Sequence, residues 1–341
     1  MKRRGVANHR GHPRHRGVHP HRQRGIAMII ALVIVALATV LAWKIGYDSY
    51  LERQRTVAML SLEQAMQFGL GAEALAGDAL ARQLQQTPQV TLAQPWAQPT
   101  PPLPITAPGD ADGPPIGSVQ GSLVNLDGRF NLNNLGHLLA NGTEDPQPLA
   151  EFQRLLAAVN LEPKWAGIAR DWIDADRIPS QPDGAEDDVY TRLTPPYWTG
   201  NWPMTSPTEL MALPGFGRRR YLAIAQYVTA LPTATAKIDI CTAPALVLES
   251  LAPSLNGEYS ADPAALATGR KNGCFPDLQT FQATVGPATW NTISDLVTDT
   301  GTYFRLTSRV TLGTTEITLY SLLQRRTDGK VVPLIRSIGT L

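Results

Sequence analysis

Residues 22–43 read RQRGIAMIIALVIVALATVLAW, a basic stretch followed at once by 18 residues in which Thr39 is the only polar side chain. At 1.5 Å per residue the apolar run spans about 27 Å, close to the hydrocarbon thickness of a bilayer. A buried core helix is the alternative, but a core has no place for the basic residues directly before the run. We therefore predict a membrane-spanning helix over 26–43.

Charge on the two sides of this helix is very uneven. The first 25 residues carry eight Lys and Arg and no acid, whereas the remainder carries 22 basic and 29 acidic residues. The positive-inside rule then places the leader in the cytoplasm and the residues from about 44 onward across the membrane. An acidic body is a poor general nucleic-acid binder. Five of the six histidines lie in the leader, so histidine-based zinc sites or Ser-His-Asp chemistry could draw only on His137.

In the rest of the chain the spacing between apolar residues changes several times. Apolar residues keep a three- and four-residue spacing to about Gln85, which predicts one long helix. Alternation around 118–126, and again over the last forty residues, predicts antiparallel strands with turns at Gly313 and Asp328-Gly329. The predicted segments are a basic leader (1–25), a transmembrane and amphipathic stalk helix (26–85), a Pro/Gly-rich loop (86–116), the first part of a sheet (117–144), an inserted helical domain (145–300) and the C-terminal strands (301–341). The fold class is α+β.

Five segments stand in order along the chain: RGIAMIIALVIVALATVLA, GSLVNLDGRFNLNNL, RDWIDADRIPSQPDGAEDDVYTRLTPPYW, NWPMTSPTELMALPGFGRRRYLAIAQYV and KIDICTAPALVLESLAP. Together they resemble the K class of minor pseudopilins of the type II secretion system, general secretion pathway protein K. The resemblance implies a pilin-like fold, in which a long N-terminal helix packs on a small antiparallel sheet that carries an inserted helix-hairpin-helix or SAM-like domain. It also implies a subunit that starts or caps the tip of the periplasmic pseudopilus, with the I- and J-class minor pseudopilins, during export of folded proteins.

Gly25, between the basic leader and the apolar helix, resembles the cleavage site of prepilin peptidase in type IV pilins and pseudopilins. The resemblance implies cleavage after Gly25 and an N-methylated Ile26 as the new amino terminus, with the helix kept in the inner membrane. Most such subunits carry Glu as the fifth mature residue, where this chain has Ile30. A subunit without that Glu cannot neutralise a neighbour's terminal amine, which suits the end of a fibre. The alternative is a membrane protein that never polymerises.

An acidic stretch over 171–188 is the strongest candidate for a metal site. Calcium takes six to eight oxygen ligands, often from carboxylates in a loop with Pro and Gly turns, and neither His nor Cys is near. The twelve-residue EF-hand spacing is absent. Because the family resemblance also implies calcium here, we predict a Ca²⁺ site formed by Asp174, Asp176, Glu186 and Asp187. A solvated acidic loop, with an aspartate capping a helix, would explain the same residues.

Cys241 and Cys274 are the only cysteines, and both fall in the part predicted to be periplasmic. In an oxidising compartment a pair is most simply a disulfide. It would close a loop of about 33 residues and stabilise the fold by roughly 3 kcal/mol on the chain-entropy model. Two separate buried thiols are the alternative.

The segment Leu213-Pro214-Gly215-Phe216-Gly217 resembles a helix-hairpin-helix turn, which in DNA-binding proteins offers backbone N–H groups to a phosphate. A membrane-anchored DNA-binding or DNA-uptake module is therefore the alternative function. The predicted location and the acidic body argue against nucleic acid as a partner, and a tight structural turn explains both glycines. An enzyme is a third class, but the sequence offers no nucleophile–base pair. We expect a non-enzymatic structural protein whose partners are prepilin peptidase, the inner membrane, other minor pseudopilins and secreted substrates.

Overall fold

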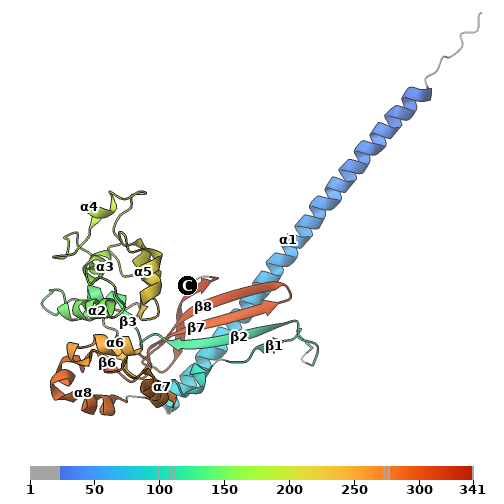
Figure 1. The fold of residues 1–341 in the computed structure, drawn as a ribbon. Helices are drawn as coiled ribbons and strands as arrows, with labels where there is room; N and C mark the ends of the chain where they lie inside the picture. The colour runs from blue at the N-terminus through green and yellow to red at the C-terminus, as the bar shows by residue number, and fades with distance from the viewer. Residues whose placement is uncertain are drawn as a thin grey trace, which may run out of the picture. The chain divides into compact units, whose positions relative to one another are not determined.

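The computed structural model describes residues 24–98, 100–107, 109–110, 112–271, 274 and 277–339. Most of the predicted leader, residues 1–23, lies outside the described residues. The chain divides into two units, residues 1–60 and 61–341, and each is described by itself. Helix α1, Arg24–Gln86, begins in the first unit and ends in the second (Figure 1).

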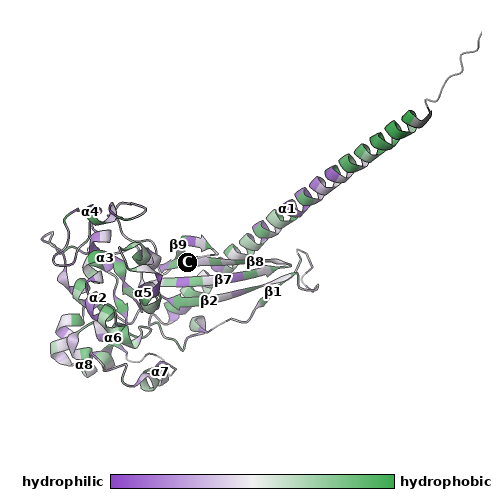
Figure 2. Cartoon of the chain, turned by 45° about the horizontal axis from the view of Figure 1, so that its top comes forward, coloured by the Kyte–Doolittle hydropathy of each residue, from purple (hydrophilic) through white to green (hydrophobic). Residues whose placement is uncertain are grey.

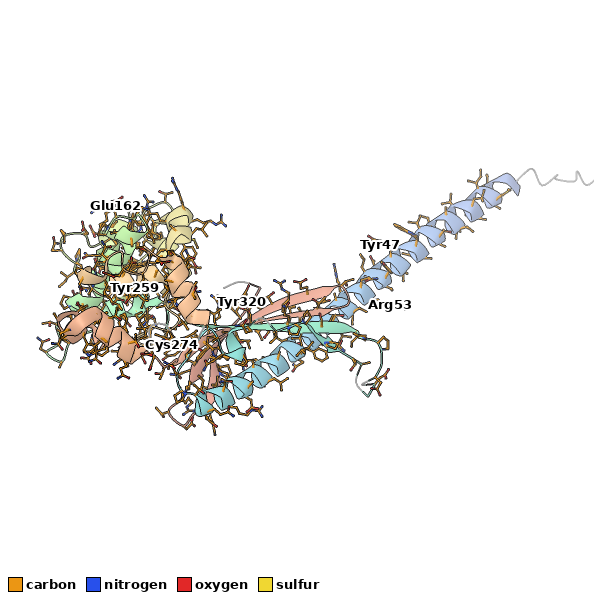
Figure 3. All side chains as sticks on the ribbon, turned by 60° about the horizontal axis from the view of Figure 1, so that its bottom comes forward. Tyr47, Arg53, Glu162, Tyr259, Cys274 and Tyr320 are labelled. Carbon is orange, nitrogen blue, oxygen red and sulfur yellow. A yellow bond between two sulfur atoms is a disulfide. The ribbon has the colours of Figure 1, made fainter. Side chains whose placement is uncertain are left out.

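In the first unit α1 is apolar on all sides at its N-terminal end (Figure 2). Every side chain from Ile26 to Tyr50 is exposed, and the helix is long and apolar enough to cross a membrane by length and composition. Thr39 donates its hydroxyl hydrogen to the carbonyl of Val35 at 2.8 Å, so this polar group needs no water. Trp43 stacks on Tyr47 with ring centroids 5.5 Å apart, and such aromatic residues are typical of a membrane–water interface (Figure 3).

The second unit contains a five-stranded antiparallel sheet whose strand order is β1-β2-β7-β8-β9. Alternate residues of β7, among them Phe304, Leu306 and Val310, pack against buried residues of α1 such as Ala65 and Leu80. The period-two pattern of the sequence thus buries one face of the sheet under the helix. The strands are β1 (Leu103–Ile105), β2 (Gly117–Asn125), β7 (Tyr303–Leu312), β8 (Thr315–Arg325) and β9 (Val331–Ile338).

An ion pair between buried Glu73 and half-exposed Arg336 fixes the register of α1 on this sheet. Glu73 lies on α1 and accepts hydrogen bonds from the guanidinium of Arg336 on β9 at 2.7–3.2 Å, and also one from the hydroxyl of Ser321 at 2.5 Å. Burial opposes the ionisation of Glu73, but these bonds outweigh it and hold its pKa below the ordinary value. Glu73 is therefore a carboxylate inside the helix–sheet interface.

Between β2 and β7 the chain forms a helical domain with its own core, in which Phe130 stacks on Phe152 at 5.1 Å. Two short parallel strand pairs, β3 with β4 and β5 with β6, hold segments that are far apart in sequence. The α+β fold class is confirmed. The elements of this domain are β3 (Phe130–Asn131), η2 (Leu132–Gly136), α2 (Pro146–Ala158), α3 (Trp165–Ile173), α4 (Asp187–Tyr190), η3 (Pro207–Ala212), α5 (Gly217–Ile224), β4 (Val228–Thr229), β5 (Ile238–Asp239), α6 (Ala245–Ser250), η4 (Pro253–Leu255), α7 (Pro263–Lys271), α8 (Leu278–Ile293) and β6 (Val297–Thr298).

Two predicted boundaries differ from the structure. The sheet segment predicted over 117–144 ends at Asn125, because Phe130, Leu132 and Leu135 are buried in the core of the helical domain. The loop predicted over 86–116 contains the edge strand β1, which pairs with β2 and buries Ile105. The insertion therefore begins almost 20 residues earlier than predicted, directly after β2.

Buried polar side chains close the junction between sheet and insertion. Asp127, just after β2, accepts hydrogen bonds from the backbone N–H groups of Thr302 and Tyr303, just before and at the start of β7. Asn125 donates to the carboxylate of Asp239 at 2.7 Å. The Asp127 bonds join the two ends of the insertion, and the Asn125 bond ties this junction to β5.

Candidate metal centre

The acidic loop between α3 and α4 is folded around one carboxylate, that of Asp171. This residue is fully buried and accepts hydrogen bonds from the backbone N–H groups of Ser180 (3.1 Å) and Ala185 (2.7 Å). A Cβ at Gly184 would collide with the Asp171 carboxylate and the Ser180 backbone, so only glycine fits there. Asp171 therefore stabilises the loop conformation, and both of its carboxylate oxygens accept hydrogen bonds from the loop backbone.

Asp174, which follows the last residue of α3, is the centre of an acidic group. Carboxylate oxygens of Glu144, Asp174 and Asp176 lie within 4.8 Å of one another. Both oxygens of Asp174 are buried and accept no hydrogen bond within the described residues. Burial, and after it the charges of Asp176, Asp171, Glu186 and Glu144, raises the pKa of Asp174 to about 7. A cation bound between these carboxylates would balance the charge of Asp174.

The structure brings together only part of the predicted ligand set. Glu186 is buried next to this group, and its Oε1 accepts no hydrogen bond in the described part of the chain. Burial raises the pKa of Glu186, and Asp171, Asp187 and Asp176 act in the same direction. Asp187 lies outside the group. Its Oδ1 accepts from the N–H (3.1 Å) and the hydroxyl (2.6 Å) of Thr199, and these bonds hold its pKa below the ordinary value.

Glu144 is the residue that sequence reasoning missed. It lies before α2, 30 residues ahead of Asp174, and its carboxylate also accepts a hydrogen bond from Arg170 at 2.6 Å. The next residue, Asp145, caps α2 by accepting from the N–H of Gln147. The local pattern around Glu144 thus indicates only a helix start. The oxygen-only donors and the unpartnered Asp174 fit a hard cation such as Ca²⁺ better than zinc.

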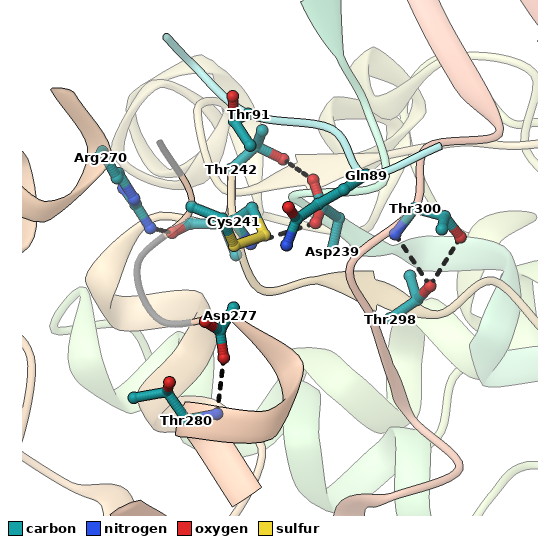
Figure 4. The surroundings of a disulfide bond; sticks show 12 residues. Gln89, Thr91, Asp239, Cys241, Thr242, Arg270, Asp277, Thr280, Thr298 and Thr300 are labelled. Carbon is teal, nitrogen blue, oxygen red and sulfur yellow. Dashed lines mark hydrogen bonds between the residues drawn. A yellow bond between two sulfur atoms is a disulfide. The ribbon is translucent and has the colours of Figure 1, made fainter. Parts of the chain in front are cut away.

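The structure joins Cys241 and Cys274 by a disulfide, with their Cα atoms 4.9 Å apart (Figure 4). Cys241 lies two residues after the end of β5, and Cys274 lies between α7 and α8. The backbone N–H of Cys241 donates to Asp239 at 3.1 Å, and Arg270 donates to the carbonyl of Ala243 beside it. The disulfide therefore ties the α7–α8 part of the insertion to the strand that holds the junction.

The helix-hairpin-helix-like turn connects η3 to α5. Gly215 and Gly217 have φ values of +81° and +67°, which explains both glycines by backbone geometry. Arg220 donates to the carbonyl oxygens of Gly215 (2.6 Å) and Phe216 (3.1 Å) and lies over the ring of Trp165. The guanidinium of Arg220 therefore stabilises the turn, whereas Arg218 and Arg219 are exposed.

The residues predicted for processing lie in α1. Gly25 and Ile26 belong to its first turn, and Ile26 is exposed. Ile30, at the position where pilin-like subunits usually carry Glu, is exposed as well.

Comparison with known proteins gives consistent results over most of the chain. The family model described as type II secretion system (T2SS), protein K, matches residues 128–233, which begin three residues after β2 ends. Type II secretion system protein K of Pectobacterium carotovorum subsp. carotovorum is 32% identical over 313 residues, which are 89% of this chain and 92% of the relative. The protein of the same name from Pseudomonas aeruginosa is 30% identical over 328 residues, or 93% of both chains.

Among solved structures, the chain is similar to the crystal structure of the GspK-GspI-GspJ complex from the enterotoxigenic Escherichia coli type 2 secretion system. The TM-score with a chain of that complex is 0.72 at 25% sequence identity. The superposition covers 84% of this chain and all of the other.

Proposed function

Since the chain belongs to the type II secretion system protein K family, and is thus a minor pseudopilin, we propose that it starts or caps the tip of the periplasmic pseudopilus. In this role it joins the I- and J-class minor pseudopilins while folded proteins are exported across the outer membrane. The structural likeness to the GspK-GspI-GspJ complex over 84% of the chain carries this proposal. The family is one of secretion-system pseudopilins, and we assign the chain a role in assembly instead of catalysis.

Co-purification tests the proposed complex. The full chain, extracted in mild detergent with its own I- and J-class proteins, should elute with both of them as one species. A chain that elutes alone, from membranes in which all three are produced, would contradict the proposal. A type IV pilin-like protein from another system serves as the control for non-specific association of membrane helices.

We further propose that prepilin peptidase cleaves after Gly25 and that the amino group of Ile26 is then methylated. The apolar, fully exposed α1 segment over 26–43 supports a single-pass inner-membrane anchor. The eight basic residues before it support a cytoplasmic N terminus and a periplasmic body. Ile30 supports a place at the end of the filament, because it offers no carboxylate to the terminal amine of another subunit.

For the acidic loop we propose a structural calcium ion. Glu144, Asp174 and Asp176 would bind it, with Glu186 beside them, and the ion would neutralise the buried charge around Asp174. Glu144 comes from before α2, whereas the two aspartates follow α3. Calcium would therefore fasten the loop to a second segment of the helical domain.

Calcium should raise the melting temperature of the full chain in detergent, by roughly 5 °C when free calcium is about 100 times the dissociation constant. Asp174→Asn and Glu144→Gln should each remove most of this shift, because each deletes a charge from the group. Asp187→Asn should keep it, because Asp187 is bound to Thr199 instead.

Asp188→Asn is the matched control for a general loss of negative charge, since Asp188 is exposed and pairs with Arg192 at 3.5 Å on the side of α4. Differential scanning calorimetry with chelator and with millimolar calcium measures these shifts. A wild-type chain that melts at the same temperature in both conditions would rule out the site.

A further inference from the structure

Two arginines, Arg129 and Arg305, lie at the border between the helical domain and the face of the sheet that α1 does not cover. On β7, Phe304 and Leu306 point toward α1, so Arg305 between them points to the opposite face. On that face Tyr303 is buried against Leu126 and Leu231 of the insertion. Arg305 is the next residue of β7 on this face and lies at the edge of the area that the insertion covers.

Neither guanidinium group forms an ion pair with another residue that the structure describes. Arg129 lies in the turn between β2 and β3, close enough to Arg305 that their positive charges oppose each other. Burial, and after it the charge of Arg305, lowers the pKa of Arg129 to about 10. Burial also lowers the pKa of Arg305. Within the part of the chain that the structure describes, neither guanidinium makes an ion pair or a hydrogen bond, and Arg305 Nε is fully buried without a partner.

Two tyrosines complete this group. Tyr320 of β8, labelled in Figure 3, pairs with Thr307 and so lies diagonal to Arg305 on the same face of the sheet. Tyr221 of α5 interacts electrostatically with both arginines. Burial raises the pKa of Tyr221, although both arginines act to lower it. Neither hydroxyl has a hydrogen-bond partner among the described residues. The hydroxyl and guanidinium groups of these four residues are therefore hydrogen-bond donors to which no carboxylate in the described part of the chain is paired.

Such an arrangement is unfavourable in isolation. Buried charges in proteins are paired, and two like charges that are partly removed from water repel each other more strongly than at an exposed surface. An oxyanion between the guanidinium groups would satisfy both, since arginine binds carboxylate and phosphate through parallel N–H donors. Exposed arginines on the same face behave differently: Arg309, four residues along β7, pairs with Glu316 at 3.6 Å.

We propose that Arg129, Arg305, Tyr221 and Tyr320 form a binding site for a carboxylate. The carboxylate comes either from an acidic side chain of a neighbouring minor pseudopilin or from a small free carboxylic acid. Because the site lies where the insertion meets the sheet, the bound carboxylate would also fix the insertion on the sheet. This site adds to the proposed role in the filament and does not depend on the calcium loop.

The first test measures the melting temperature of the full chain in detergent, with succinate or with chloride at equal ionic strength. Succinate should raise the melting temperature of the wild type by several degrees and leave Arg129→Gln and Arg305→Gln unchanged. In chloride alone both variants should be at least as stable as the wild type, because each removes one of two repelling charges. Arg309→Gln should respond to succinate like the wild type. A wild type that does not respond, with both variants less stable in chloride, would overturn the site.

The second test identifies the source of the carboxylate. Arg305→Glu and the control Arg309→Glu are co-expressed with the I- and J-class proteins, and the complex is purified. Loss of the complex with Arg305→Glu alone identifies a neighbour's acidic side chain. An intact complex, together with succinate binding by the wild type, identifies a free carboxylic acid. An intact complex with no succinate response refutes the proposal, while the complex formed by the wild type tests the filament role separately.

Discussion

Replacing Gly25 with leucine should leave the leader attached to the membrane helix and abolish secretion. A side chain at the cleavage position would block the approach of the peptidase to the backbone, and the eight positive charges of residues 1–25 would remain at the cytoplasmic end of the helix. Each Lys or Arg costs about 2.5–3.5 kcal/mol at the centre of a membrane helix. The uncleaved subunit therefore cannot be drawn out of the bilayer into a filament.

The mass of the chain isolated from membranes measures this effect, together with export of a secreted protein from a strain that carries only the variant. We expect a start at Met1 and no export. Gly46→Leu is the matched control, because Gly46 lies in the same helix and a Cβ there has open space around it. If the Gly25→Leu chain began at Ile26 and supported normal export, the proposed processing would be wrong.

The parts of the fold that were predicted correctly have their signals within a few neighbouring residues. The membrane helix follows from 18 consecutive apolar positions, and the strands β7, β8 and β9 follow from alternation and from turns at Gly313 and Gly329. In both cases the spacing of apolar residues within one element is enough to predict that element. Neither prediction required knowledge of a distant contact.

The start of the insertion was missed because its signal is not local. Phe130 and Asn131 alternate like a strand and do form β3, but β3 pairs with β4, almost 100 residues later in the chain. The side chain of Asn133 likewise donates to the carbonyls of Met204 and Leu231. Asn131 also caps η2, which is a local role, but the contacts that assign this segment to the helical domain are visible only in the fold.

The candidate sites also differ in whether their residues are close together or far apart in the sequence. Asp174 and Asp176 were predicted because they lie two residues apart in an acidic loop, whereas Glu144 comes from a helix start whose sequence indicates only capping. Conversely, the sequence favoured Asp187, whose carboxylate is occupied by Thr199. Arg129 and Arg305 are separated by most of the insertion and gave no sequence signal at all.

Removing the side chain of Asp127 should be among the most destabilising single changes in the second unit. In Asp127→Ala the backbone N–H groups of Thr302 and Tyr303 lose their acceptor, and an unsatisfied buried donor costs about 1–3 kcal/mol. We expect the free energy of unfolding to fall by about 3 kcal/mol or more. Asp127→Asn keeps an acceptor oxygen and should lose far less. Urea unfolding of the full chain in detergent compares the two variants, and equal losses would show that these hydrogen bonds do not hold the junction.

The pH dependence separates the charge of Asp127 from its hydrogen bonds. Burial raises the pKa of Asp127 from 3.8 to about 7, against its backbone hydrogen bonds and aided by the charge of Asp239, whose own pKa burial raises to about 6. The folded chain thus binds these protons more tightly than the unfolded chain. Their contribution to stability is complete below about pH 4 and is lost as the pH rises through 6 and 7. Asp127→Asn carries no such charge, so its stability relative to the wild type should increase between pH 5 and pH 8. A difference that stays constant over this range would mean that Asp127 is ionised throughout, with its two backbone hydrogen bonds outweighing burial.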